Sequence, residues 1–483
     1  MGIISENILD LGDYTSFGLQ RCLKDKMETV VLDEGGLYSP LSISLVIPTR
    51  FGGEEGREIE REALKKILSE CSELVDAGYL DEIVVIDATR DKNGNPDYRV
   101  LQNVLKVAYE EIGLFREQVI LLNKYGSENE KGKRGLIDFF IKVVHQFDEN
   151  IPKVLARFGV FGVTRARAHV FGIPYGKGAG LWLSIPITGG DILCFVDSDI
   201  LNFKKEFVTA LCHPIVYSWN LRETAMKFVK AYYMRLTKTP DLSSEEAILG
   251  GRVCRLFATP LIQSVTSSLD LYGSLGTIRY PLAGEFALSR DAIERLDLSS
   301  TYSVEMYLLF QLLDLFGSAS MAQVNLQVYN HIGQNFLKLE SLARQVGTCI
   351  LEKAIEKRNK SLTDKESKQI LRSYKENANQ MIKKSEKWIS KLRKSTEIGV
   401  RKKLVYSKEE DEKRIQCFLK ILENVLSEKA KERIIPLPSW SRIKEKTGNY
   451  FILREMLRRR SNQSTWSRLK ECGLVSRPAP SEM

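Results

Sequence analysis

Apolar and polar positions follow two different periods along this chain from Leu41 onward. Residues 42–48 (SISLVIP) and 82–87 (EIVVID) are short β-branched apolar runs, which predict buried strands. Between them, residues 58–77 repeat apolar side chains at helical spacing, which predicts an amphipathic helix. A strand, a helix and a second strand ending on a carboxylate, Asp87, are typical of the nucleotide-binding start of an α/β fold.

The later elements follow the same alternation. Residues 116–123 (REQVILLN) predict a third strand, and the charged stretch 124–170 is interpreted as an insertion. Residues 176–190 predict a helix entered through glycines, and residues 191–199 (DILCFVDSD) predict an apolar strand that ends in acidic residues. Further strands are predicted at 225–235 and 321–329, and further helices at 253–268 and 304–316. This pattern predicts an α/β fold whose mixed sheet is flanked by helices.

The C-terminal part of the chain differs from the rest in charge. Residues 351–483 hold 34 Lys and Arg against 18 Asp and Glu, a net charge of +16, whereas the preceding 350 residues carry −7. This part is also helix-prone, with a break near 436–439 (PLPS). We therefore expect an N-terminal segment over residues 1–40, an α/β domain over 41–346, and a basic, mainly helical region over 347–483.

Several classes of protein are excluded by composition. No apolar run reaches the roughly 20 residues of a membrane-spanning helix, and the first 38 residues lack the pattern of a secretion signal. A cytoplasmic protein without a membrane span is expected. The eight cysteines are scattered and form no C-x-x-C pair, so they are expected to be free thiols rather than zinc ligands.

Candidate chemistry begins where the strand at 191–199 ends. Asp197-Ser198-Asp199 offers two short carboxylates to a hard divalent cation, Mg²⁺ or Mn²⁺, which prefers oxygen ligands and retains phosphate oxygens. The alternative is that these residues only begin a turn or cap a helix. Upstream, Lys177 stands between two glycines, where an ammonium reaches a phosphate closely, although an exposed loop lysine is equally compatible.

Three further positions carry candidate groups. Arg252 follows Gly250 and Gly251, and its planar guanidinium suits a phosphate or carboxylate unless the segment is only a flexible turn. Glu285 lies in an apolar, glycine-containing turn, where it would orient a sugar or serve as a capping residue. His331 follows a predicted strand and is one of only four histidines, and a lone histidine is more often structural than a ligand.

In combination and order these segments resemble glucosyl-3-phosphoglycerate synthases, which are retaining glycosyltransferases with the GT-A fold. The resemblance covers residues 41–346. It is carried by GKGAGLW from Gly176, GDILCFVDSDI from Gly190, GGRVCRLFATPLI from Gly250, PLAGEFALSR from Pro281, SVEMYLLFQLLDLFG from Ser303, and AQVNLQVYNH from Ala322. It implies transfer of glucose, or of mannose, from a nucleotide diphosphate sugar to 3-phosphoglycerate. UDP-glucose is the favoured donor, with GDP-mannose as the alternative.

The resemblance also implies roles for single residues. Asp199 and His331 would hold the Mg²⁺ or Mn²⁺ ion, and the other roles fall into three groups. The donor would be bound by Pro48, Asp87, Lys177, Asp197 and Ser198, the acceptor by Gly251 and Arg252, and Glu285 with Asp199 would serve catalysis. The basic C-terminal region is expected to pack on the catalytic domain or to mediate self-association into a homo-oligomer.

Departures from the family pattern fall where substrates would be chosen. Thr49-Arg50-Phe51-Gly52-Gly53 follows Pro48, Cys254 replaces an acceptor-binding threonine, and Ile332-Gly333-Gln334 follows His331. A different small acceptor is therefore one alternative. A nucleotidyltransferase is a second alternative, since it also joins acidic metal ligands to a nucleotide-binding sheet. The third is a non-enzymatic protein that binds nucleotide sugars or nucleic acid, with the basic region as its binding surface.

Overall fold

The structure is a computed structural model of the 483-residue chain. It describes residues 7–32, 38–51, 57–125, 138–160, 176–221, 225–238, 246–332, 336–394, 403–427, 434 and 436–475. Its internal contacts divide the chain into two units. Unit 1 comprises Met1–Ser16, Leu221–Gly284 and Thr301–Pro436, and unit 2 comprises Phe17–Asn220, Glu285–Ser300 and Leu437–Met483.

Unit 2 is built on a mixed sheet in the order β10-β7-β4-β5-β6. Its strands are β4 (Ile43–Thr49), β5 (Glu82–Asp87), β6 (Ile141–His145), β7 (Ile192–Phe195) and β10 (Phe286–Ser289). β10 is antiparallel to β7, whereas β7, β4, β5 and β6 are mutually parallel. These strands are almost entirely buried, as expected for parallel strands that helices cover on both faces.

The helices of unit 2 come from both halves of the chain. They are α1 (Leu19–Glu28), α2 (Arg57–Asp76), α3 (Arg99–Lys106) with a π-helical turn (Val107–Ile112), α4 (Arg116–Tyr125), α5 (Asn150–Arg157), α7 (Lys177–Ile187), α8 (Lys205–Ser218), α10 (Arg290–Ile293), α15 (Trp440–Thr447) and α16 (Tyr450–Glu471). The short strands are β2 (Val30–Leu32), β3 (Tyr38–Pro40) and β11 (Leu298–Ser299), and β14 (Pro436–Leu437) lies at the boundary between the units.

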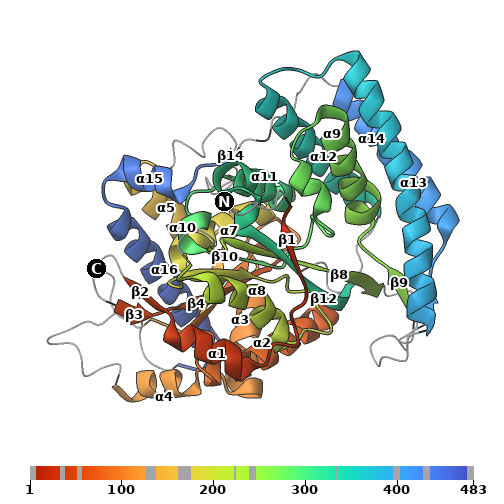
Figure 1. The fold of residues 1–483 in the computed structure, drawn as a ribbon. Coiled ribbons are helices and arrows are strands. Elements are labelled where there is room, and N and C mark those ends of the chain that lie inside the picture. The colour runs from red at the N-terminus through yellow and green to blue at the C-terminus, as the bar shows by residue number, and fades with distance from the viewer. Residues whose placement is uncertain are drawn as a thin grey trace. The chain divides into compact units, whose positions relative to one another are not determined.

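The last helices of the chain are part of the unit 2 core. The indole rings of Trp182 and Trp440 stack with centroids 4.5 Å apart, and Trp440 Nε1 donates to the carbonyl of Trp182 at 2.8 Å. α16 packs against β6, where Thr465 Oγ1 accepts the backbone N–H of Val143 at 2.9 Å. The described residues after Pro436 therefore pack within unit 2 (Figure 1).

Unit 1 carries the strands β1 (Leu9–Asp13), β8 (Phe228–Lys238), β9 (Glu246–Leu249), β12 (Met321–Ile332) and β13 (Lys403–Val405). They run in the order β1-β12-β8-β9-β13, and only the β8–β9 pair is antiparallel. Its helices are a π-helical turn (Cys254–Ala258), α9 (Thr259–Leu269), a 3-10 turn η6 (Gly273–Thr277), α11 (Val304–Phe316), a 3-10 turn (Ser318–Ser320), α12 (Phe336–Arg358), α13 (Asp364–Lys394) and α14 (Lys408–Ser427).

The long helix α13 is fastened to α9 and α14 inside unit 1 (Figure 1). Tyr374 donates to the carbonyl of Leu256 at 3.0 Å, and Asn377 donates to Ser264 Oγ at 2.9 Å. Apolar side chains continue the contact, because Ile389 packs with residues of β8, β9 and β13 in one buried cluster. α13 is thus firmly packed within unit 1.

The predicted fold class is confirmed: a mixed sheet is flanked by helices, and the C-terminal region is mainly helical. The strand predicted at 116–123 is wrong, because these residues form α4. Arg, Glu, Gln and Leu are good helix formers, and a short apolar run does not distinguish a strand from a helix. The neighbour of β5 is instead β6, which lies within the stretch interpreted as an insertion. Residues 126–137 and 161–170 of that stretch lie outside the described residues.

The boundaries at residues 40 and 346 remain a sequence-based prediction, and the contacts group the chain in another way. None of the helices in the described part of the chain combines the length and the apolar character that a membrane span requires.

Candidate functional site

The carboxyl ends of the parallel strands of unit 2 share one edge of its sheet, which is where open α/β sheets bind ligands. Pro48 lies at the end of β4 opposite Ile86, and Asp87 is the last residue of β5. β7 is parallel to β4 and leads through Val196 to Asp197. The sheet therefore brings three predicted donor-binding residues, Pro48, Asp87 and Asp197, to the same edge.

Lys177 and Asp197 meet at this edge. Lys177 is the first residue of α7 and follows Gly176, whose φ of 132° is a conformation that glycine adopts easily. Lys177 Nζ lies 2.7 Å from Asp197 Oδ1, and the two side chains are 15% and 23% exposed. The structure thus pairs two of the predicted donor-binding residues in a partly buried ion pair that remains accessible from solvent.

Close packing explains Gly180, the last glycine of the GKGAG segment. Every residue of α7 after Lys177 is buried. A Cβ at Gly180 would lie 3.1 Å from Gln146 Oε1 and 3.2 Å from a methyl carbon of Ile86. A residue without a side chain therefore lets α7 approach the ends of β5 and β6, and this approach places Lys177 at the sheet edge.

Asp87 lies at the centre of a buried polar cluster. The hydroxyl groups of Thr49 and Thr89 each donate to Asp87 Oδ1 at 2.7 Å, and His145 Nε2 lies 3.5 Å from Oδ2. Burial raises the pKa of Asp87 to about 7, and the two threonine hydrogen bonds act in the opposite direction. Asp87 therefore titrates near neutral pH, which is unusual for an aspartate.

His145 is neutral in this cluster. Burial lowers its pKa to about 4, against the raising effect of its hydrogen bond with the carbonyl of Thr89. Its Nε2 lies 2.8 Å from that carbonyl, and its Nδ1 accepts the backbone N–H of Phe147 at 3.1 Å. These two contacts place the proton on Nε2. The cluster links the ends of β4, β5 and β6 without an imidazolium charge.

The acidic turn and the predicted catalytic glutamate lie near the end of β7. Ser198 and Asp199 follow Asp197 in a partly exposed turn. Glu285 is fully buried and directly precedes β10, which is antiparallel to β7 with Phe286 opposite Phe195. Glu285 is therefore beside the point where β7 leads into the acidic turn.

The structure leaves the predicted metal ligands untested. Asp199 belongs to unit 2, whereas His331 belongs to unit 1, so their pairing remains a prediction. Among the described residues, no group of three or more His, Cys, Asp and Glu side chains is arranged to hold a metal ion. His331 is fully buried near the end of β12, with its ring centroid 5.1 Å from that of Tyr329.

Unit 1 contains the predicted acceptor residues in a tight glycine turn. A Cβ at Gly250 would collide with Thr237 Oγ1 and would lie 3.1 Å from Arg235 Cγ. Gly251 has a φ of 66°, and a Cβ there would collide with the hydroxyl of Tyr280. Both positions therefore require glycine, for steric reasons that the pattern Gly-Gly-Arg alone does not reveal.

Arginines concentrate beside this turn. Burial lowers the pKa of Arg252, and the positive charges of Arg414, Arg235 and Arg255 lower it further. Arg255 binds Asp411 through two contacts of 2.5 and 3.3 Å, and Arg414 contacts the same carboxylate at 3.0 Å. The Asp411 carboxylate thus contacts two guanidinium groups, and Arg235 and Arg252 add positive charge close by, which favours an anionic ligand.

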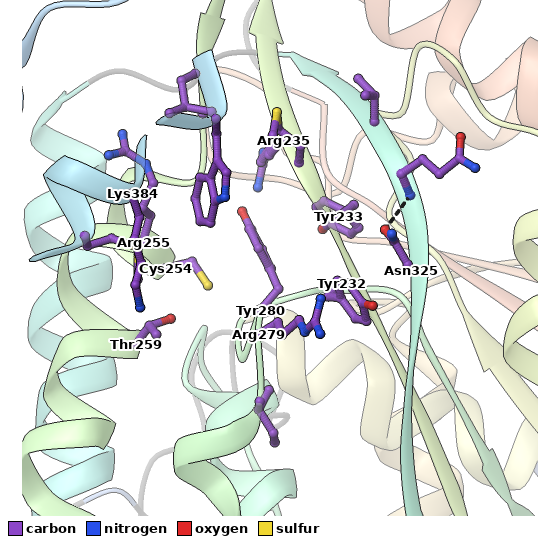
Figure 2. Close-up of a pocket in the computed structure, with 18 of the residues that line it drawn as sticks. Tyr232, Tyr233, Arg235, Cys254, Arg255, Thr259, Arg279, Tyr280, Asn325 and Lys384 are labelled. Carbon is purple, nitrogen blue, oxygen red and sulfur yellow. Dashed lines mark hydrogen bonds between the residues drawn. The ribbon is translucent and has the colours of Figure 1, made fainter. Parts of the chain in front are cut away.

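A cavity of about 660 Å³ opens next to the turn (Figure 2). Its walls come from β8, the β9 end, the helix start at Cys254, the η6 segment and α13. Figure 2 shows the side chain of Tyr280 extending through the middle of this space, with Cys254 on one side and Tyr232 on the other. Gly250 and Cys254 line the cavity, and burial raises the pKa of the Cys254 thiol to about 12, so this thiol is not a nucleophile at neutral pH.

Two curated relatives show which proteins this sequence resembles. No family model matches the chain. It is 36% identical to the glucosyl-3-phosphoglycerate synthase of Mycobacterium tuberculosis H37Rv over 179 residues, which are 37% of this chain and 52% of that protein. It is 35% identical to the protein of the same name from Petrotoga mobilis over 200 residues, covering 40% and 57%. The resemblance to this family is confirmed, although the chain spans about half the length of these relatives.

Solved structures of the Mycobacterium tuberculosis glucosyl-3-phosphoglycerate synthase are also similar. Its complex with phosphoglyceric acid has a TM-score of 0.48 and 23% identity, covering 72% of this chain and 88% of that chain. Its complex with Mn²⁺, UDP-glucose and phosphoglyceric acid has a TM-score of 0.47 and 24% identity, covering 72% and 87%.

Sequence reasoning missed two groups of residues. Thr49, Thr89 and His145 surround Asp87, and their only sequence signal was their position after apolar runs, which for His145 was hidden in the supposed insertion. Lys384 and Trp388 line the unit 1 cavity from α13. They could not be assigned from sequence, because more than a hundred residues separate them from the glycine turn.

Proposed function

We propose that this protein is a retaining glycosyltransferase that transfers glucose from UDP-glucose to 3-phosphoglycerate, with Mg²⁺ or Mn²⁺ as cofactor. The observation that carries the proposal is the ion pair of Lys177 with Asp197, at the carboxyl edge of the unit 2 sheet. The chain is also 36% identical to a glucosyl-3-phosphoglycerate synthase over 179 residues. GDP-mannose is the alternative donor.

The donor would be bound by unit 2. Lys177 would contact the diphosphate, because an ammonium compensates the negative charge that grows on the leaving nucleotide. Asp197 and Ser198 would contact the nucleoside, and Pro48 and Asp87 would line the pocket of the base. Glu285, buried next to the acidic turn, would accept hydrogen bonds from hydroxyl groups of the transferred sugar.

The acceptor would be bound by unit 1. Beside the turn at Gly250 and Gly251, Arg252 brings a guanidinium whose fork matches a phosphate or carboxylate. Arg414, Arg235 and Arg255 add positive charge around it. These groups would hold a small phosphorylated acid with its hydroxyl free to attack the sugar.

The acidic turn fits a magnesium or manganese ion that it would bind together with substrate phosphates. Mg²⁺ is usually held in proteins by one or two carboxylates together with waters and phosphate oxygens. Asp199 supplies such a carboxylate in a partly exposed turn, and His331 is the second ligand that the resemblance implies. When bound, the ion would stabilise negative charge on the departing diphosphate.

The decisive experiment incubates the purified chain with UDP-glucose and 3-phosphoglycerate, with and without EDTA, and detects products by mass. We expect a glucosylated phosphoglycerate that disappears with EDTA, and NMR of the new anomeric centre would report retention. GDP-mannose and unphosphorylated glycerate are run in parallel. Product formation in EDTA would contradict the metal, and pyrophosphate release from a nucleoside triphosphate would instead indicate a nucleotidyltransferase.

A matched pair of variants tests the acceptor assignment. Arg252→Lys should raise the KM for 3-phosphoglycerate about tenfold and leave the KM for UDP-glucose nearly constant, because an ammonium does not reproduce a bidentate contact. Arg372→Lys, an exposed arginine on α13, serves as the control. An equal effect of Arg252→Lys on phosphoglycerate and glycerate would mean that Arg252 does not bind the phosphate.

A further inference from the structure

The cavity of unit 1 is too large for the acceptor of the proposed reaction. It has a volume of about 660 Å³, within the range of about 300–1,000 Å³ typical of sites for drug-sized ligands. Phosphoglycerate has about eleven non-hydrogen atoms, so it would fill roughly 330 Å³ even if each took the about 30 Å³ of a liquid water. At least half of the cavity would then remain for another chemical group.

Among the described residues that line the cavity, the charged side chains are all cationic. They are Arg235, Arg255, Arg279 and Lys384. Asp411 partly balances Arg255, and Asp10 lies 2.6 Å from Arg279. Lys384 has no ion-pair partner among the described residues, and it is exposed on α13. The cavity therefore favours a ligand with at least one negative charge.

Aromatic side chains also line the cavity. Tyr232, Tyr233, Tyr280 and Trp388 all line the cavity. Tyr233 and Tyr280 pack together with centroids 4.7 Å apart, whereas the indole of Trp388 is 38% exposed. An indole at the wall of a polar, cationic cavity offers a flat apolar surface to a ring that also carries hydroxyl groups, and a pyranose is such a ring.

α13 presents these groups in a fixed direction. Met381, Lys384 and Trp388 are spaced by three and four residues, so they lie along one face of the helix. The next residues anchor it, because Ser385 Oγ accepts from Arg255 at 3.0 Å and Ile389 is buried against β8 and β9. Lys384 and Trp388 are therefore held over the cavity by a helix that cannot turn without breaking buried contacts.

We propose that this cavity binds a larger acceptor, an anionic glycoside in which a phosphorylated or carboxylated acid already carries a hexose ring. The acidic group lies at the glycine turn and Arg235, and the hexose lies on Trp388 beside Lys384. This inference rests on the proposed function and widens its acceptor class. In the reaction, the anomeric carbon of the donor bonds to a hydroxyl oxygen of the glycoside, UDP leaves with the electron pair of its bond to that carbon, and the hydroxyl proton is released.

Transfer assays with the full chain and UDP-glucose test the proposal. Glucosyl-3-phosphoglycerate is offered as acceptor beside 3-phosphoglycerate, and we expect a product with a second glucose, formed with a kcat/KM at least equal to that for phosphoglycerate. Trp388→Ala should lower kcat/KM for the glycoside at least tenfold and for phosphoglycerate much less. Lys383→Gln, an exposed lysine of α13 that does not line the cavity, is the control and should change neither value.

Calorimetry without donor separates this inference from the proposed function. We expect glucosyl-3-phosphoglycerate to bind at least tenfold more tightly than 3-phosphoglycerate, and Trp388→Ala to remove that advantage. If phosphoglycerate is glucosylated but the glycoside neither binds nor reacts, the inference fails and the proposed function stands. If the glycoside binds through Trp388 but no acceptor receives glucose, the proposed function fails and the binding site stands. Binding of UMP that depends on Trp388, without binding of the glycoside, would overturn the inference in favour of a nucleotide site.

Discussion

The two candidate sites of this molecule differ in how they are built. In unit 2 the functional side chains follow directly from the ends of parallel strands, so that Asp87 and Asp197 lie at one sheet edge, on either side of β4. In unit 1 the cavity wall is assembled from β8, the Cys254 turn, η6 and α13, which are far apart in the sequence. The first site is a consequence of local topology, and the second depends on long-range packing.

The two sites also handle charge differently. The unit 2 edge balances its charges locally, through the Lys177–Asp197 pair and the neutral His145 beside Asp87. Unit 1 gathers Arg255 and Arg414 around the buried carboxylate of Asp411. We infer that unit 2 offers a phosphate the ammonium of Lys177 from a locally balanced ion pair, and that the neighbouring arginines of unit 1 favour an anion.

The largest expected effect concerns the buried ion pair of unit 1. Asp411 and Arg255 side chains are 1% and 5% exposed, and Asp411→Ala would leave a buried guanidinium without its partner, at a cost of about 3–5 kcal/mol. Urea unfolding would measure this loss. Glu412→Ala, which removes an exposed carboxylate from the same helix, should cost less than about 0.5 kcal/mol.

A double variant sharpens that test. Arg255→Met with Asp411→Leu removes both charges and should recover most of the stability, because apolar side chains can replace a buried ion pair. The net charge of unit 1 would stay the same, because one cation and one anion are lost together. A cost below about 1 kcal/mol for Asp411→Ala alone would mean that the pair is not important for unit 1.

The second effect is a loss of activity in unit 2 without a loss of its folded structure. Asp199→Ala should lower kcat by about 10²-fold or more, because it removes a group expected to stabilise charge in the transition state. Its side chain lies in a partly exposed turn, so the free energy of unfolding should change little. Steady-state kinetics across a Mg²⁺ and Mn²⁺ titration would measure it, with Glu149→Ala as an exposed control. Near-normal turnover at all metal concentrations would refute the assignment.

Most of the unit 2 sheet could be predicted from the sequence. The strands ending at Asp87 and leading to Asp197 were predicted because their apolar runs are bounded by polar residues, and the helix after Gly176 was predicted from its glycines and apolar residues. The error at 116–123 arose because eight residues with four apolar side chains fit a strand and a helix equally well. Only the presence of β6 beside β5 decides between the two.

The unit 1 cavity could not be predicted in the same way. Gly250, Gly251 and Arg252 were singled out by their residue types, but the collision partners Thr237 and Tyr280 are set by tertiary structure. The basic charge of the C-terminal region was visible, whereas its division was not: α13 joins unit 1 and α16 joins unit 2. Helical periodicity shows that a face is apolar, and it does not show which partner covers that face.

A third effect separates backbone strain from steric collision at the glycine turn. Gly251→Ala places a side chain at a φ of 66° and against the Tyr280 hydroxyl, so acceptor binding should weaken by about 1–3 kcal/mol. Gly317→Ala has a similar φ of 74° with open space around it, so its effect on the free energy of unfolding should report the backbone strain alone. Adding Tyr280→Phe to Gly251→Ala should recover part of the affinity in calorimetry. No recovery would mean that strain, and not the hydroxyl, decides.

The last expected effect concerns the pH dependence of the buried cluster in unit 2. Burial raises the pKa of Asp87 to about 7 in the folded protein, whereas an aspartate in the unfolded chain titrates near 3.9. Between these values the folded state retains a proton that the unfolded state has lost, so the stability that Asp87 contributes falls as pH rises from about 4 to about 7. His145 acts in the opposite direction, because its pKa is lowered to about 4 and its contribution grows as pH rises.

Asp87→Asn isolates the first contribution, because the effect of His145 is common to both proteins and cancels in their difference. The stability of wild type relative to Asp87→Asn should therefore decrease from pH 4 to pH 7, by on the order of 4 kcal/mol at about 1.4 kcal/mol for each pKa unit, and remain constant above that range. Urea unfolding at several pH values would measure the difference. Thr89→Val, which removes one hydrogen bond to Asp87 Oδ1, should raise the pKa further and move the decrease to higher pH. If the difference between wild type and Asp87→Asn instead grows with pH, Asp87 is ionised in the folded protein, and the unit 2 edge carries one more negative charge than we infer.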